Sequence, residues 1–195
     1  MKLEELEEVV EKNILKLFST FYEKPAIFLS EADVECYLYT LLINEPSIRD
    51  FSPTIQYVPG LCCMESSKSL LVHAELPVNI EDMEQKRERK PDISIFEPKE
   101  TSDFSDWGLV VGIEIKYNRK EPARKEKSSI LEDVKKVAAY KKGYILWLNW
   151  DREIKEDHLK KAEKSVEEYE NVKLLYLDLF SDPVKTNVKG IPSTK

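Results

Sequence analysis

The chain has 195 residues, 42% of them hydrophobic and 34% charged, with a formal net charge of −7. This length fits about one domain, and no run of 18 apolar residues is present to cross a membrane. The acidic N-terminal segment lacks the apolar region of a signal peptide. Cys36, Cys62 and Cys63 are odd in number and form no C-x-x-C pair, which argues against a disulfide framework or structural zinc. We therefore expect reduced thiols and a cytoplasmic protein without a membrane partner.

Two regions of opposite charge stand out along the chain. Residues 1–50 carry 11 acidic and 5 basic side chains, whereas residues 116–142 carry ten basic and four acidic ones. The distribution of charge says more about partners than the sum does. The overall acidity does not exclude a nucleic-acid partner, because the second region offers a basic surface.

Apolar spacing predicts the elements in chain order. The N-terminal half begins with a helix over residues 3–18 and a second helix after the N-cap Ser30, which stops before Pro46. Strands are then expected over residues 69–78, 91–96, 108–117, 144–150 and 172–177. Helices over residues 129–142 and 153–168 separate the last three strands, and a loose tail is expected over residues 181–195.

This order of elements predicts an α/β fold with a mixed sheet flanked by helices. Three consecutive strands can form an antiparallel meander, and the later strand–helix–strand units require parallel crossovers. We expect a single domain over residues 1–180, with its core at about residues 30–150 and the first helix added to that core.

The segment Gly108–Tyr117 contains the main candidate functional residues. Its odd-numbered residues are apolar, while Glu114 and Lys116 share the opposite face of a very hydrophobic strand. Buried charge is costly unless it is paired or binds a metal. Asp92 begins the preceding strand, and in a meander its carboxylate can lie beside Glu114. Two adjacent carboxylates repel each other, and a hard divalent cation such as Mg²⁺ relieves that repulsion.

Pro91-Asp92, a spacer of 21 residues and Glu114-Ile115-Lys116 resemble the motif of the PD-(D/E)XK nuclease superfamily. That superfamily includes many restriction endonucleases and Holliday-junction resolvases. Its restriction-endonuclease-like αβββαβ core, with an acidic residue on the first helix, is similar to the order expected here over residues 30–150. The resemblance implies a Mg²⁺- or Mn²⁺-dependent endonuclease.

The resemblance also implies roles for individual residues. Asp92, Glu114 and the carbonyl of Ile115 would hold the metal, and Lys116 would orient the attacking water and stabilise charge on the phosphate. The acidic residue of the first core helix corresponds to Glu31 or to Glu35, one turn later, and we favour Glu31 because it starts the helix.

The resemblance makes DNA the expected polymer, because most members act on it. Positive side chains after the motif would contact its phosphates. The predicted nucleic-acid-binding residues are Arg119, Lys120, Arg124, Lys125 and Lys136. A homodimer is an allowed oligomeric state.

Other interpretations stay open. Glu-x-Lys recurs in this charged sequence, so Glu114 and Lys116 could form an ion pair on a solvated edge strand. Asp92 after Pro91 could be a turn residue. The alternative function is a non-catalytic nucleic-acid- or protein-binding module on the same fold, since a fold alone does not assign function.

Overall fold

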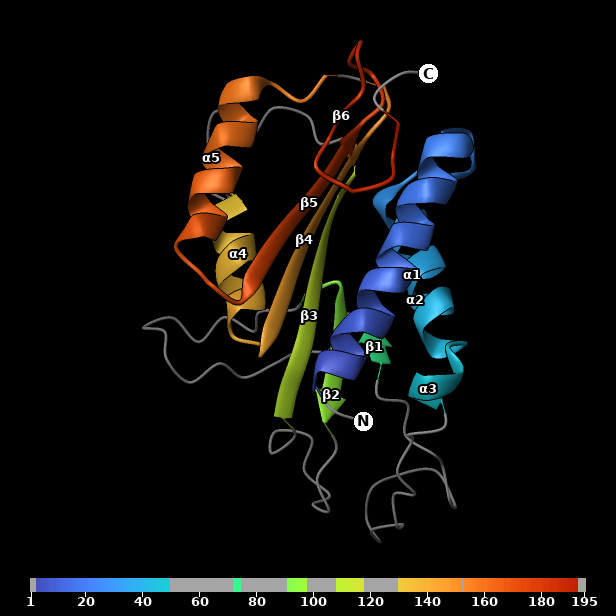
Figure 1. The fold of residues 1–195 in the computed structure, drawn as a ribbon, viewed down its shortest axis with the longest axis vertical. Helices are drawn as coiled ribbons and strands as arrows, with labels where there is room; N and C mark the ends of the chain where they lie inside the picture. Colours follow the sequence, from blue (N-terminus) through green and yellow to red (C-terminus); the bar gives the residue numbers. More distant parts are fainter. Residues whose placement is uncertain are drawn as a thin grey trace, which may run out of the picture.

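A computed structural model describes residues 3–49, 72–74, 91–97, 108–117, 130–151 and 153–192. These residues form a mixed β-sheet between two layers of helices (Figure 1). The elements in chain order are α1 (Leu3–Glu23), the 3₁₀ helix η1 (Pro25–Ile27), α2 (Glu31–Ile43), α3 (Pro46–Arg49), β1 (Val72–Ala74), β2 (Ile93–Glu97), β3 (Gly108–Tyr117), α4 (Ile130–Ala138), β4 (Lys142–Asn149), α5 (Glu156–Glu167), β5 (Val172–Asp178) and β6 (Lys185–Thr186).

The sheet follows the chain, with the strand order β1-β2-β3-β4-β5-β6. β1, β2 and β3 pair in antiparallel fashion, β3, β4 and β5 pair in parallel, and β6 returns antiparallel to β5. The predicted α/β class, with a meander followed by parallel crossovers, is confirmed. β3 therefore lies inside the sheet, with β2 on one side and β4 on the other.

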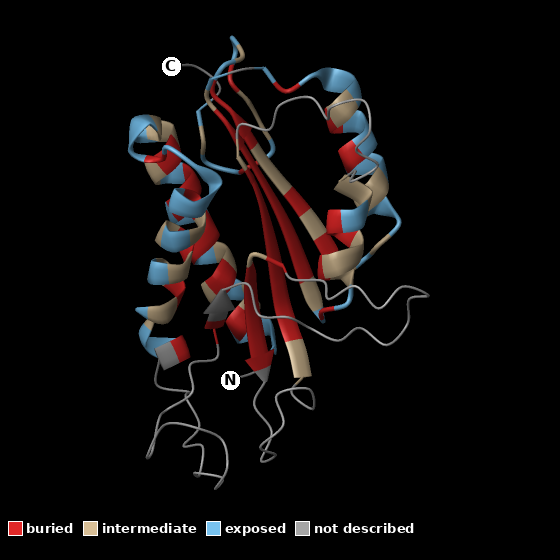
Figure 2. Cartoon of the chain, turned by 180° about the vertical axis from the view of Figure 1, so that it is seen from behind, coloured by how far each residue is buried: buried red, intermediate tan, exposed pale blue. Residues whose placement is uncertain are grey.

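Each face of the sheet has its own apolar core. α1 and α2 pack on one face, against β3 residues such as Val111 and Ile113. α4 and α5 pack on the other face, against Ile145 and Trp147 of β4. The central strands are buried along most of their length (Figure 2). Glu114 and Lys116 alternate with the first set of residues, so they point to the α4 side.

α1 is longer than predicted and belongs to the main core. Val10, Ile14 and Leu17 are fully buried. Near its N-terminus, Glu7 forms ion pairs with Lys142 of β4 at 2.7 Å and with Lys173 of β5 at 3.1 Å. The first helix therefore packs against strands that lie far from it in the sequence.

α2 begins where the sequence predicts. The Ser30 hydroxyl accepts the N–H of Asp33, while the Asp33 carboxylate accepts the N–H of Ser30 at 2.8 Å, which completes a capping box. This cap fixes Glu31 as the first residue of the helix.

α4 is held to the sheet by a close approach to β3. A Cβ added at Gly112 would lie 2.7 Å from the Tyr140 ring, so any larger residue would force the ring or the strand to shift. The Tyr140 hydroxyl, in turn, is 2.8 Å from the Ser94 hydroxyl of β2. These contacts position the helix that faces Glu114 and Lys116.

The expectation of a loose tail is wrong for residues 181–192. β6 extends the sheet, and Val184 and Val188 are buried in the main core. The Asn187 side chain accepts the N–H of Tyr176 and donates to the carbonyl of Leu174, so it binds β5 as a strand would. The free energy gained by burying two valines stabilises this segment, although its composition is typical of loops.

Among the described helices, none has the length and apolar character needed to cross a bilayer. Cys36 is an exposed free thiol, while Cys62 and Cys63 lie outside the described residues.

Candidate active site

Asp92 binds the end of the neighbouring strand. Its Oδ2 atom accepts the N–H of Ile115 at 2.5 Å. The β2–β3 pairing starts at Ile93 and Ile113, so Ile115 lies beyond the last paired residue and Asp92 supplies the missing acceptor. The N–H and C=O of one strand residue point to the same side. The Ile115 carbonyl is therefore directed to the side of β3 on which Asp92 lies.

Glu114 is only 2% exposed and is held by two lysines. Its Oε1 atom accepts hydrogen bonds from the ammonium groups of Lys116 at 2.6 Å and Lys136 at 2.8 Å. Its Oε2 atom is buried and has no hydrogen-bond partner among the described residues. A buried carboxylate oxygen without a donor is costly, so this atom indicates a place for a further group.

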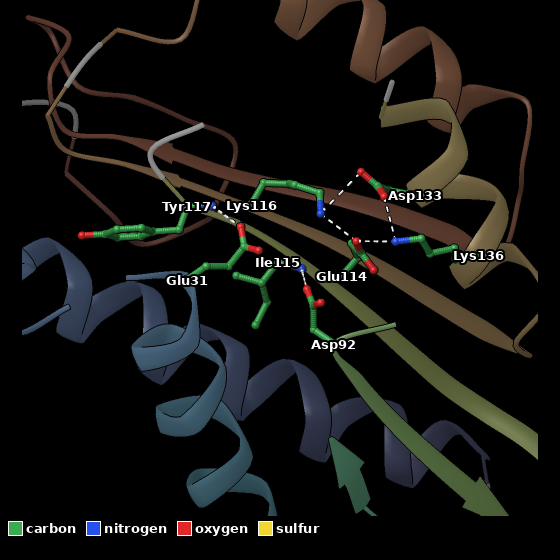
Figure 3. Close-up of polar contacts among 8 residues, drawn as sticks. All are labelled: Glu31, Asp92, Glu114, Ile115, Lys116, Tyr117, Asp133 and Lys136. Atoms are coloured by element: carbon green, nitrogen blue, oxygen red, sulfur yellow. Dashed lines mark hydrogen bonds and ion pairs between the residues drawn. The ribbon is translucent and has the colours of Figure 1, made fainter. Parts of the chain in front are cut away.

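Asp133 of α4 completes a ring of four charges (Figure 3). Its carboxylate lies 3.4 Å from the Lys116 ammonium and 3.0 Å from the Lys136 ammonium. Glu114, Lys116, Asp133 and Lys136 therefore alternate in sign around a closed ring, which we call the charge ring. Two positive and two negative groups balance, which lowers the cost of burying them.

The electrostatics of the site show an excess of negative charge. Burial and the nearby Glu114 carboxylate raise the pKa of Asp92 to about 7. Burial also raises the pKa of Glu114, against the effect of Lys116. For Asp133, burial would raise the pKa, but Lys116 and Lys136 bring it below the usual value. The charge ring is balanced, so the excess negative charge belongs to the acids outside it, Asp92 and the nearby Glu31.

Both ring lysines are firmly cationic. Burial alone would lower the pKa of Lys116 and Lys136, but Glu114 and Asp133 together raise both above the usual value. These two ammonium groups are the positive charges that the described residues bring to the site.

Glu31 reaches the same end of β3 from the other helical layer. Its Oε2 atom accepts the N–H of Tyr117 at 3.2 Å, and its charge contributes to the raised pKa of Asp92. Of the two acids that the sequence left open, Glu31 is bonded to β3 at the residue next to Lys116. The Tyr117 hydroxyl donates to the carbonyl of Phe28 and accepts from the Trp150 indole at 2.6 Å, which ties this strand end to the segment before α2.

The structure thus brings Asp92, Glu114, Ile115, Lys116 and Glu31 to one region of β3. The ion pair of Glu114 and Lys116 exists, but it lies inside the sheet under α4 and not on a solvated edge.

Lys136 is part of the charge ring, with its side chain 24% exposed, and its predicted contact with nucleic acid stays a prediction. Arg119, Lys120, Arg124 and Lys125 lie outside the described residues.

Sequence reasoning missed Asp133. The signal was present, because Asp133 and Lys136 are three residues apart and adjoin the inward-facing Val134 and Val137. An acid and a base on the flank of an apolar helix face were easily taken for solvated residues.

The donor atoms are of the chemical type that binds a hard divalent cation. Asp92, the unpartnered Oε2 atom of Glu114 and the Ile115 carbonyl are all oxygen ligands, which Mg²⁺ prefers. Within the described ranges, no group of three or more His, Cys, Asp or Glu side chains is arranged to hold a metal. A cation here would therefore depend on two carboxylates, a backbone carbonyl and water.

The chain was compared with models of protein families, with curated proteins and with solved structures. None of the three comparisons finds a match.

Proposed function

We propose that this protein is a metal-dependent nuclease with a restriction-endonuclease-like fold, which hydrolyses phosphodiester bonds, with DNA as the expected substrate. One observation carries the proposal: the buried Glu114 carboxylate and Lys116 ammonium lie beside the half-buried Asp92 carboxylate at the end of β3, and one buried oxygen of Glu114 has no described partner. The resemblance of Asp92, Glu114, Ile115 and Lys116 to the PD-(D/E)XK motif adds to it.

The topology supports the same proposal. Apart from the short helix α3 between α2 and β1, the described elements α2, β1, β2, β3, α4 and β4 follow one another as helix, three strands, helix and strand. The three strands are antiparallel, and the crossover through α4 to β4 is parallel. This is the αβββαβ order that the resemblance implies, and Glu31 lies on its first helix.

The charge balance supports a cation. The Asp92 carboxylate lies outside the balanced charge ring, and its pKa is raised to about 7 because burial and Glu114 disfavour its ionised form. Asp92, Glu114 and the Ile115 carbonyl would hold Mg²⁺ or Mn²⁺. The cation would supply positive charge against the phosphate and lower the pKa of nearby water.

The remaining roles belong to this chain's own side chains. In hydrolysis, a water oxygen attacks phosphorus, the bond to the leaving sugar oxygen breaks, and that oxygen takes up a proton. Lys116, a buried cation on the same strand as Glu114, would orient the water and stabilise the charge that develops on the phosphate. Glu31 would form the boundary of the site on the α2 side.

The test is cleavage of supercoiled, branched and single-stranded DNA, and of RNA, by the full chain with Mg²⁺, Mn²⁺ or EDTA. We expect cleavage with either metal, none in EDTA, and a loss of roughly 10²-fold or more in Lys116→Ala. Asp157→Asn, which changes an exposed carboxylate on α5, is the control and should cleave like the wild type. The absence of metal-dependent cleavage on DNA and on RNA would refute the proposal.

A second candidate function is a non-catalytic binding module on the same fold. It is favoured by the charge ring, in which Lys116 and Lys136 already neutralise Glu114 and Asp133 without a cation. Such a module predicts that neither Mg²⁺ nor Mn²⁺ changes the melting temperature of the wild type. The nuclease predicts a rise that is lost in Asp92→Asn.

A further inference from the structure

Asp133 is the one member of the charge ring to which neither the nuclease motif nor the predicted nucleic-acid contacts give a role. It lies on α4, across from the end of β3, and is 7% exposed. One of its oxygens, Oδ2, lies 3.4 Å from the Lys116 ammonium, and Oδ1 lies 3.0 Å from the Lys136 ammonium. Its carboxylate therefore contacts Lys116 from a different element than Glu114 does (Figure 3).

A lysine ammonium needs more than one anchor to have a fixed direction. Its four-carbon stem is flexible, and its three donors rotate freely. Glu114 lies only two residues from Lys116 on the same strand, so their hydrogen bond alone would let the ammonium swing around a single carboxylate oxygen. A second anion on α4 restricts that motion.

Asp133 is itself well fixed. Its helix is buried through Val134 and Val137, and the contact of Tyr140 with Gly112 and Ser94 holds the end of that helix to the sheet. Lys136, one turn later, binds the other oxygen of Asp133. The carboxylate therefore has little freedom to follow a moving lysine.

We propose that Asp133 is a positioning residue, which fixes the direction of the Lys116 ammonium for phosphodiester hydrolysis. This inference rests on the proposed function, because it assigns Asp133 a task in that reaction. Asp133 acts through Lys116 and touches neither the substrate nor the reacting atoms.

The test is a double-mutant cycle on the full chain. The single-turnover rate constant for cleavage of supercoiled plasmid DNA is measured with Mg²⁺ at saturating protein, for the wild type, Asp133→Asn, Lys116→Ala and the double variant. We expect Asp133→Asn to slow the wild type by about 10- to 100-fold, the range for groups that orient a reacting side chain. In the Lys116→Ala background, Asp133→Asn should alter the rate by less than about 3-fold, because the ammonium group that Asp133 orients is absent.

Two results overturn the inference. One is an Asp133→Asn variant that cleaves at the wild-type rate, and the other is an equal slowing in both backgrounds, which is what general damage to the fold predicts. Asp157→Asn is the control for loss of a carboxylate.

The Asp133→Asn variant leaves two buried ammonium groups on one carboxylate and can unfold for that reason. Asp133→Asn combined with Lys136→Met removes one charge of each sign, so the remaining Glu114–Lys116 pair stays balanced. This variant should fold, as measured by its cooperative thermal transition, and should still cleave at least about 10-fold slower than the wild type. A folded variant with the wild-type rate contradicts the inference.

A spectroscopic measurement separates this inference from the proposed function. The lysine ammonium signals of ¹⁵N-labelled protein are recorded by NMR, and the Lys116 signal is identified by its loss in Lys116→Ala. We expect this signal to shift or broaden in Asp133→Asn and to stay unchanged in Asp157→Asn. An unchanged Lys116 signal in Asp133→Asn refutes the positioning role, whereas a wild type that cleaves no nucleic acid refutes the proposed function.

Discussion

The ionised carboxylate of Asp92 should destabilise the folded protein when no cation is bound. The pKa of Asp92 is raised from 3.8 to about 7, first by burial and then by the charge of Glu114. Between these two values the unfolded chain has released a proton that the folded protein still holds. The contribution of Asp92 to stability therefore falls as the pH rises from about 4 to about 7, and this contribution changes no further above that range.

The magnitude follows from the size of the shift. A difference of about 3 pKa units corresponds to about 4 kcal/mol, at 1.36 kcal/mol for each unit. Asp92→Asn removes the charge and keeps an oxygen that can accept the N–H of Ile115. We therefore expect this variant to be more stable than the wild type in EDTA, by up to about 4 kcal/mol at pH 8.

The assay is urea unfolding of the wild type, Asp92→Asn and Asp157→Asn in EDTA at pH 5 and pH 8. The gain in unfolding free energy of Asp92→Asn over the wild type should be smaller at pH 5, because this pH lies between the two pKa values of 3.8 and about 7. Asp157→Asn, on the exposed surface of α5, should show no comparable gain. If Asp92→Asn is no more stable than the wild type at pH 8, the reasoning about its charge is refuted.

Three further predictions concern the same region. Mg²⁺ should raise the melting temperature of the wild type more at pH 8 than at pH 6, because it binds the ionised form of Asp92; an equal rise at both pH values contradicts this. Lys116→Ala should destabilise the metal-free protein by about 3 kcal/mol in urea unfolding, because it leaves two buried carboxylates with one lysine. Lys160→Ala, which removes an exposed ion pair, should cost much less than Lys116→Ala, and similar losses in both would contradict the burial argument. Gly112→Ala should destabilise by about 1–3 kcal/mol in thermal unfolding, because its methyl group meets the Tyr140 ring, and an unchanged melting temperature would exclude that contact.

Local patterns predicted the elements well where one signal dominated. The segment Gly108–Tyr117 was predicted with its observed bounds, because ten residues of β-favouring and alternating character leave no competing interpretation. Ser30 likewise marked the start of α2, where it forms the N-cap of a capping box with Asp33. Both signals depend on neighbours in the sequence.

Features that depend on distant partners could not be predicted in this way. β6 forms because Val184 and Val188 find a core built by other elements. Asp133 joins the charge ring because α4 crosses the end of β3, and no pattern within the helix itself contains that crossing. The motif identified Asp92 just before β2 and the three residues Glu114, Ile115 and Lys116 of β3. The contribution of α4 became evident only from the three-dimensional structure.

The packing of α1 has a consequence for how the chain folds during synthesis. Its acids bind side chains far along the sequence: Glu11 accepts from Tyr144 across 133 residues, and Glu7 accepts from Lys173 across 166. α1 therefore cannot complete its contacts until β5 has been translated. Its apolar face must wait until then, and such long-range contacts slow folding. The final packing of α1 against the sheet is accordingly a late event, which follows the synthesis of β5.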